Sequence, residues 1–106
     1  MAEYVARRNP NRCPTHPGEL LREVIPATGK SKMEIAALLG ISHQHLYDIL
    51  AERKPVSPTM AVRLGKLFGD GAGVWVRMQG AHDTWCAERE LAAEIRKIPT
   101  LKPAAA

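Results

Sequence analysis

The chain has few cysteines, few aromatic residues and no long hydrophobic run, and each shortage excludes a class of protein. Its two cysteines, Cys13 and Cys86, lie far apart among 106 residues, so they form no disulfide framework and we expect two reduced thiols. Aromatic residues make up 5%, which argues against an all-β protein. No apolar run approaches the length of a membrane span, and residues 1–14 lack the apolar segment of a signal peptide. We therefore expect a cytoplasmic protein with no membrane association.

Motifs of catalysis and of metal binding are also missing. There is no Gly-rich phosphate loop and no nucleophile elbow, so we expect neither enzyme activity nor a cofactor. Cys13 and His16 have a spacing that suits two ligands of one metal ion, but no second close pair completes a tetrahedral site. His43 and His45 are two residues apart, so on a helix their side chains face different ways. The sequence thus predicts no metal site.

Residues 31–54, SKMEIAALLGISHQHLYDILAERK, form the most informative stretch and predict two short helices joined at a glycine. Ser31 and Glu34 have the spacing of a capping box, and Gly40 stands where the first helix should end. Ser42 can cap the second helix, whose apolar residues share one inner face. Two such helices around a tight turn are typical of the helix-turn-helix motif, in which the second helix lies in a DNA major groove.

The outer face of the second helix carries candidates for contacts with DNA. Four residues lie near its start, where side chains reach base edges: Ser42, His43, Gln44 and Tyr47. Gln44 suits a bidentate contact with adenine, whereas Asp48 is expected to pair with a basic neighbour such as Arg53. Candidate phosphate contacts lie at both ends of the motif: Ser31, Lys32, Arg53 and Lys54. Each of these residues is equally compatible with an ordinary solvated side chain.

The distribution of charge along the chain agrees with DNA binding by residues 1–69 but does not establish it. The net charge of +4 lies entirely in residues 1–69, which hold ten basic and six acidic residues, whereas residues 70–106 hold five of each. A basic surface attracts phosphates. We expect residues 1–14, which include Arg7, Arg8 and Arg12, to form an irregular basic arm that either contacts DNA or is a solvated terminus.

Three further helices are expected around the motif. The first begins at Pro17 behind a cap at Thr15 or His16, and Pro26 should end or kink it near Ile25. Another follows the Ser-Pro pair at 57–58 and ends in the Gly-Asp-Gly at 69–71, and the last spans about 72–98. The fold class is all-α, with about five helices in one domain, 15–98, followed by a tail, 99–106.

The last helical segment carries apolar side chains that suit either the core or a contact between two copies. They are Trp75, Met78, Trp85, Leu91 and Ile95. A ligand site at the two tryptophans is the weaker alternative. One recognition helix reads only a few base pairs, so we expect a homodimer on a palindromic operator, with part of residues 75–98 at its interface.

Three stretches, HPGELLREVIPATGKSKMEIAALLGISHQHLYDIL, SPTMAVRLGKLFG and VWVRMQGAHDTW, resemble the HigA-type antitoxins, also labelled virulence-associated protein I, within the phage-repressor-like (Cro/CI, XRE) helix-turn-helix proteins. The resemblance covers about residues 16–101. It implies a lambda-repressor-like bundle and the antitoxin of a type II toxin–antitoxin pair, which binds a HigB/RelE-like mRNA-cleaving toxin. It also implies a dimer that represses its own operon, with residues 42–50 as the base-reading helix. A solitary XRE-family repressor without a toxin partner is the alternative.

Overall fold

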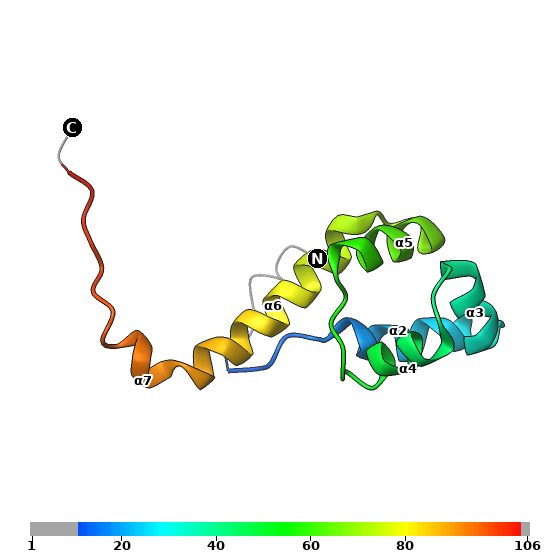
Figure 1. Cartoon of the computed structure of the whole chain (residues 1–106), viewed down its shortest axis with the longest axis horizontal. Helices are drawn as coiled ribbons and strands as arrows, with labels where there is room; N and C mark the ends of the chain where they lie inside the picture. Colours follow the sequence, from blue (N-terminus) through cyan, green and yellow to red (C-terminus); the bar gives the residue numbers. More distant parts are fainter. Residues whose placement is uncertain (1–10, 105–106) are drawn as a thin grey trace.

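The computed structural model describes residues 11–104, which form helices joined by short loops and contain no strand (Figure 1). The helices are α2 (Pro17–Ala27), α3 (Lys32–Leu39), α4 (His43–Leu50), α5 (Pro58–Phe68), α6 (Ala72–Glu90) and α7 (Ala92–Ile95). The all-α prediction is confirmed. Of the predicted basic arm, Arg7 and Arg8 lie outside the described residues, and residues 11–14 form no helix.

The helix-turn-helix consists of α3 and α4, and local sequence signals set its ends. Ser31 Oγ accepts the Glu34 N–H and Glu34 Oε1 accepts the Ser31 N–H, so the predicted capping box is present. Gly40 adopts the left-handed conformation, with φ of 72°, and its N–H and that of Ile41 close the last turn of α3. Ser42 caps α4 by accepting a backbone N–H from the first turn. These three predictions are confirmed.

Helix α2 departs from the prediction at its C-terminal end. It begins behind His16, whose Nδ1 accepts the Gly18 N–H at 2.9 Å. The predicted end or kink near Ile25 is wrong in position, because α2 continues through Pro26 for one more residue. A proline in the last turn removes a single intrahelical hydrogen bond. The Thr28 hydroxyl and N–H both donate to the Ile25 carbonyl, at 2.6 and 3.0 Å, and close the helix end.

The predicted last helix is divided in two. Helix α6 runs through Gly80 without a break. It ends at Glu90, because φ of −101° and ψ of 13° at Leu91 depart from helical geometry, and α7 follows.

One apolar core fills the space between α2, α3, α4, α5 and the first turns of α6. Its buried residues are Leu21, Ile25, Ile35, Ala36, Leu39, Leu46, Ile49, Leu50, Val56, Met60, Ala61, Leu64 and Trp75. Trp75 is 1% exposed, its ring centre lies 6.0 Å from that of Phe68, and its Nε1 donates to Asp70 Oδ1 at 2.9 Å. Trp75 therefore belongs to the core of a single copy, and its assignment to the dimer interface is corrected.

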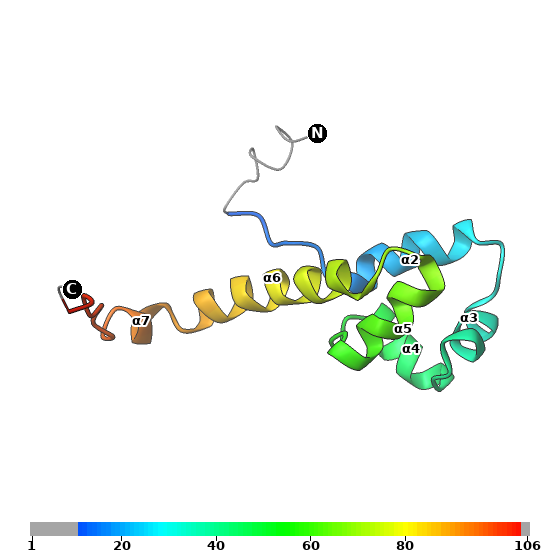
Figure 2. The ribbon, with the colours of Figure 1, turned by 90° about the horizontal axis from the view of Figure 1, so that it is seen from above.

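Helix α6 packs against the bundle along its first half and then extends away from it (Figures 1 and 2). The last buried residue of α6 is Gln79, which is 5% exposed and accepts the Val56 N–H at 2.8 Å. Beyond Gln79, no described residue of α6 or α7 is buried. Among residues 11–104, none of the helices is long and apolar enough to cross a lipid bilayer.

Candidate nucleic-acid interface

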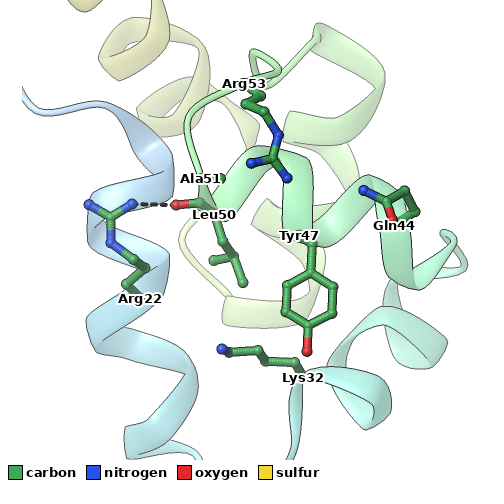
Figure 3. Close-up of a pocket in the computed structure, with 7 residues that line it drawn as sticks. All are labelled: Arg22, Lys32, Gln44, Tyr47, Leu50, Ala51 and Arg53. Atoms are coloured by element: carbon green, nitrogen blue, oxygen red, sulfur yellow. Dashed lines mark hydrogen bonds between the residues drawn. The ribbon is translucent and has the colours of Figure 1, made fainter.

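Side chains of α3 and α4 meet around Tyr47 on the exposed side of the helix-turn-helix (Figure 3). The ring of His43, one turn earlier on α4, stands edge-on to the Tyr47 ring with centres 4.3 Å apart. Lys32 Nζ, from the first turn of α3, lies 5.3 Å from the centre of the same ring. Edge-to-face and cation–π contacts both favour these orientations. Three of the predicted DNA contacts thus form one cluster across the two helices.

Gln44 is oriented by Asp48, its neighbour one turn along α4. Gln44 Nε2 donates to Asp48 Oδ1 at 3.0 Å. Arg53 donates to the same oxygen through Nε at 3.2 Å and Nη2 at 3.0 Å, and Lys54 Nζ lies 3.6 Å from Asp48 Oδ2. The hydrogen bonds from Gln44 and Arg53 hold the pKa of Asp48 below its ordinary value, so the carboxylate stays charged.

Two predicted phosphate contacts are therefore already engaged within the chain. Asp48 was expected to pair with Arg53, and this pairing is confirmed. The Asp48 carboxylate offsets part of the positive charge of Arg53 and Lys54. The side chain of Arg53 is 63% exposed, which leaves part of its guanidinium facing solvent.

Ser31 is engaged as well. Its N–H and hydroxyl oxygen both bond Glu34, and the backbone N–H of Ser31 is the main cause that lowers the pKa of Glu34. A charged carboxylate therefore lies at the N-terminus of α3, where a phosphate was expected. Lys32, the other predicted phosphate contact at the N-terminus of α3, has no carboxylate partner among the described ion pairs.

Arg22 of α2 belongs to the same surface and was not among the predicted DNA contacts. Its Nη1 donates to the Leu50 carbonyl at the end of α4, and its Nη2 lies 3.0 Å from Glu52 Oε2. The contact joins residues 28 apart in the chain, so no local pattern could have indicated it.

Two open hollows flank Tyr47. One, of about 380 Å³, lies between α2 and α4 and is lined by Arg22, Lys32, Gln44, Tyr47, Leu50, Ala51 and Arg53 (Figure 3). The other, of about 410 Å³, is lined by Ile25, Pro26, Lys30, Ser31, Lys32, Met33, His43 and Tyr47. Cationic side chains line both hollows, Tyr47 lines both and Gln44 lines the first, so the surface combines groups that attract phosphates with groups that read bases.

The fold and this surface define a helix-turn-helix protein of the DNA-binding class. The chain is 36% identical over 76 residues to virulence-associated protein I of Dichelobacter nodosus, a match that covers 71% of this chain and 70% of that protein. The chain belongs to this family, the HigA-type helix-turn-helix antitoxins, as the sequence predicted. No family model matches the chain.

Solved structures agree with this assignment. Antitoxin GraA in complex with its operator is 35% identical, with a TM-score of 0.78 over 92% of this chain and 98% of that one. The Pseudomonas aeruginosa antitoxin HigA with the higBA promoter is 30% identical, with a TM-score of 0.74 over 87% of this chain and 99% of that one. The predicted fold class is thereby confirmed.

Proposed function

We propose that the chain is the antitoxin of a type II toxin–antitoxin module. It binds a palindromic operator as a homodimer, represses its own operon and neutralises a HigB/RelE-like mRNA-cleaving toxin in the cytoplasm. The role is one of binding and requires no catalysis. The observation that carries the DNA half of the proposal is the exposed cluster of Lys32 on α3 with His43 and Tyr47 on α4. Gln44 lines the same hollow as Lys32 and Tyr47.

Gln44 is the residue proposed to read a base. A carboxamide has two N–H donors and one oxygen acceptor, and Asp48 uses one donor. The remaining N–H and the oxygen match adenine N7 and N6 in the major groove. The bond to Asp48 fixes the amide before DNA arrives, which lowers the conformational entropy lost on binding. Ser42, His43 and Tyr47 complete the proposed base-reading set.

Lys32 is the proposed primary phosphate contact. It lies beside Tyr47, so a phosphate bound there positions α4 along the groove without selecting a sequence. Arg53 and Lys54 contribute less because Asp48 offsets their charge, and Ser31 contributes only its hydroxyl beside Glu34.

The test compares Gln44→Ala with Lys32→Ala on the operator and on an unrelated duplex. Gln44→Ala should weaken operator binding by about 1–3 kcal/mol and leave non-specific binding unchanged. Lys32→Ala should weaken both equally and reduce the slope of log K against log salt by about 0.9. Titration by fluorescence anisotropy at several salt concentrations measures the operator affinity, the non-specific affinity and the slope of log K against log salt. Equal losses on both duplexes for Gln44→Ala would show that Gln44 does not read a base.

The proposed dimer contact lies on the extended end of the molecule. Leu91 and Ile95 are 49% and 44% exposed and lie four residues apart, so two large aliphatic side chains face solvent on neighbouring turns. Met78 and Trp85 are half-buried on the preceding turns of α6, and Arg89 covers the Trp85 ring at 3.9 Å. Burying this apolar surface against a second copy would pair two recognition helices.

The toxin half of the proposal rests on family membership and needs its own experiment. The chain and the reading frame adjacent to its gene are co-expressed, with a tag on the neighbour only. Co-purification, together with suppression of the neighbour's mRNA cleavage, supports the antitoxin role. A neighbour that neither binds the chain nor cleaves mRNA would leave a solitary repressor.

A further inference from the structure

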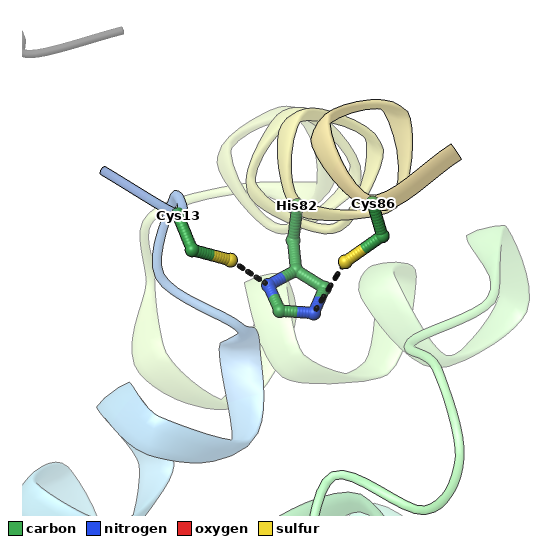
Figure 4. A group of neighbouring side chains, drawn as sticks. All are labelled: Cys13, His82 and Cys86. Atoms are coloured by element: carbon green, nitrogen blue, oxygen red, sulfur yellow. Dashed lines mark hydrogen bonds between the residues drawn. The ribbon is translucent and has the colours of Figure 1, made fainter. Parts of the chain in front are cut away.

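Cys13, His82 and Cys86 come together where the segment before α2 meets α6 (Figure 4). Cys13 Sγ lies 3.5 Å from His82 Nδ1, and Cys86 Sγ lies 3.8 Å from His82 Nε2. One ligand atom from each residue can be chosen so that all three lie within 4.8 Å of one another. Cys13 is 69 residues from His82, whereas His82 and Cys86 are one helical turn apart.

The His82 ring is held in one orientation by the backbone. Its Nδ1 lies 2.9 Å from the Pro14 carbonyl oxygen, which can only accept, so the ring proton is on Nδ1. This tautomer leaves a lone pair on Nε2, the nitrogen beside Cys86 Sγ. Histidines that bind metals through one nitrogen usually donate the other N–H to a carbonyl or carboxylate, which fixes the ring.

We propose that Cys13, Cys86 and His82 Nε2 bind one zinc ion. With Zn–S near 2.3 Å and Zn–N near 2.0 Å, neighbouring ligand atoms of a tetrahedral site lie roughly 3.5–3.8 Å apart. The Cys86 Sγ to Nε2 distance of 3.8 Å meets this requirement. Thiolate and imidazole ligands favour zinc over magnesium or calcium.

Cys13 needs a small rearrangement to join the site. Its sulfur lies beside the other ring nitrogen, and the side chain is exposed on a non-helical segment, so it has room to turn toward Nε2.

His16 does not supply a fourth ligand, although its ring centre is 5.0 Å from that of His82. Its Nδ1 accepts the Gly18 N–H, so the neutral ring carries its proton on Nε2 and has no free lone pair. The site therefore has three protein ligands and an open fourth position, which a solvent molecule can take, as in other three-ligand zinc sites. Zinc would tie residue 13 to α6 and so hold the start of α2 against it.

The experiment uses the full, untagged chain, because a histidine tag would itself bind zinc. The protein is reduced, freed of metal and titrated with Zn²⁺ in competition with a chromophoric chelator. We expect one Zn²⁺ per chain and a rise in Tm on zinc binding. Co²⁺ in place of Zn²⁺ should give thiolate-to-cobalt charge-transfer absorption, which reports sulfur ligation directly.

Variants identify the ligands. Loss of a residue that only supports a metal ligand typically weakens metal binding by roughly 10–100-fold. Loss of a ligand itself should weaken zinc binding by more, and this is expected for each of Cys13→Ser, Cys86→Ser and His82→Gln. His43→Gln, an exposed histidine on α4, is the matched control and should bind zinc as the unmodified chain does. All three ligands lie outside the core, and circular dichroism verifies that the variants remain folded.

Two results would overturn the proposal. One is a reduced chain that takes up no stoichiometric zinc, or whose zinc uptake persists unchanged in Cys13→Ser. The other is a Cys13–Cys86 disulfide, seen as a mass lower by two hydrogens in air, in a chain that binds no zinc when reduced.

Discussion

Asp48 is an acidic residue within a surface that is proposed to face phosphates, and its partners explain why it is tolerated. It orients Gln44, accepts a hydrogen bond from Arg53 and forms an ion pair with Lys54. Asp48→Asn would keep an oxygen acceptor for Gln44 while releasing the two cations. We expect the variant to bind any duplex more tightly. The slope of log K against log salt should become steeper by about 0.9 for each phosphate newly contacted.

Salt-dependent titrations of the operator and of an unrelated duplex measure both effects of Asp48→Asn. Because the gain is electrostatic, the ratio of specific to non-specific affinity should fall or stay constant. A weaker affinity for both duplexes would contradict the description of Asp48 as a residue that offsets cationic charge.

His16 links stability to pH. Burial lowers its pKa from the ordinary value of 6.5, and its Nδ1 must be unprotonated to accept the Gly18 N–H. The unfolded chain therefore binds a proton more readily than the folded one. The contribution of His16 is complete above about pH 6.5 and is lost as pH falls through its lower folded-state pKa.

Thermal unfolding between pH 7.5 and 5 tests this linkage, with His16→Asn as the matched variant. Asparagine is a good N-cap that does not titrate. The Tm of the unmodified chain should fall more steeply below pH 6.5 than that of His16→Asn. Parallel Tm curves for the two proteins would exclude His16 as a source of the pH dependence.

At the scale of helices, the junction of α5 and α6 depends on Gly65. A Cβ there would lie 2.3 Å from the Gly71 carbonyl carbon and 2.5 Å from the Ala72 nitrogen, and backbone atoms cannot move aside cheaply. Overpacking typically costs about 1–3 kcal/mol. Gly65→Ala should therefore lower the free energy of unfolding by at least this amount.

Gly80→Ala is the matched control, because a Cβ at Gly80 meets nothing within 4 Å and the residue lies inside α6. Alanine is favoured over glycine in a helix interior by roughly 0.5–1 kcal/mol, so this variant should be stabilised. Chemical denaturation of both variants gives the two changes in free energy of unfolding. A Gly65→Ala protein as stable as Gly80→Ala would refute the close approach.

Helix ends were predictable because their causes are local. The Ser31–Glu34 cap and the left-handed Gly40 depend on residues within a few positions of one another. The position of the α2 end was wrong because backbone and side-chain donors at Thr28 close the helix after Pro26.

Long-range features were not predictable from the sequence. Trp75 lies at helical spacing with other apolar residues, and only the packing against Phe68 and the bond to Asp70 assign it to the core. Arg22 and the Cys13–His82–Cys86 cluster join segments 28 and 69 residues apart. Such contacts depend on the tertiary arrangement and leave no periodic pattern in the chain.

For the whole molecule, the extended end of α6 and α7 is proposed to pair two copies. Leu91→Asp with Ile95→Asp should give a monomer that retains its fold, because both side chains lie outside the core. Binding to a full palindrome should weaken by about 100-fold or more, since the two half-sites are no longer linked.

The control for the dimer variant is Leu101→Asp, at an 86% exposed position outside the proposed contact. Analytical ultracentrifugation gives the mass of each protein, and titration with half and full operators gives the affinities. A double variant that remains dimeric would place the interface elsewhere.

Two copies are proposed to place their α4 helices in successive major grooves of one operator. Hydroxyl-radical footprinting on the promoter of the chain's own gene tests it most directly. We expect two protected half-sites related by two-fold symmetry, with centres about 10–10.5 base pairs, or a multiple, apart. A single protected site, or uniform protection along the duplex, would contradict it.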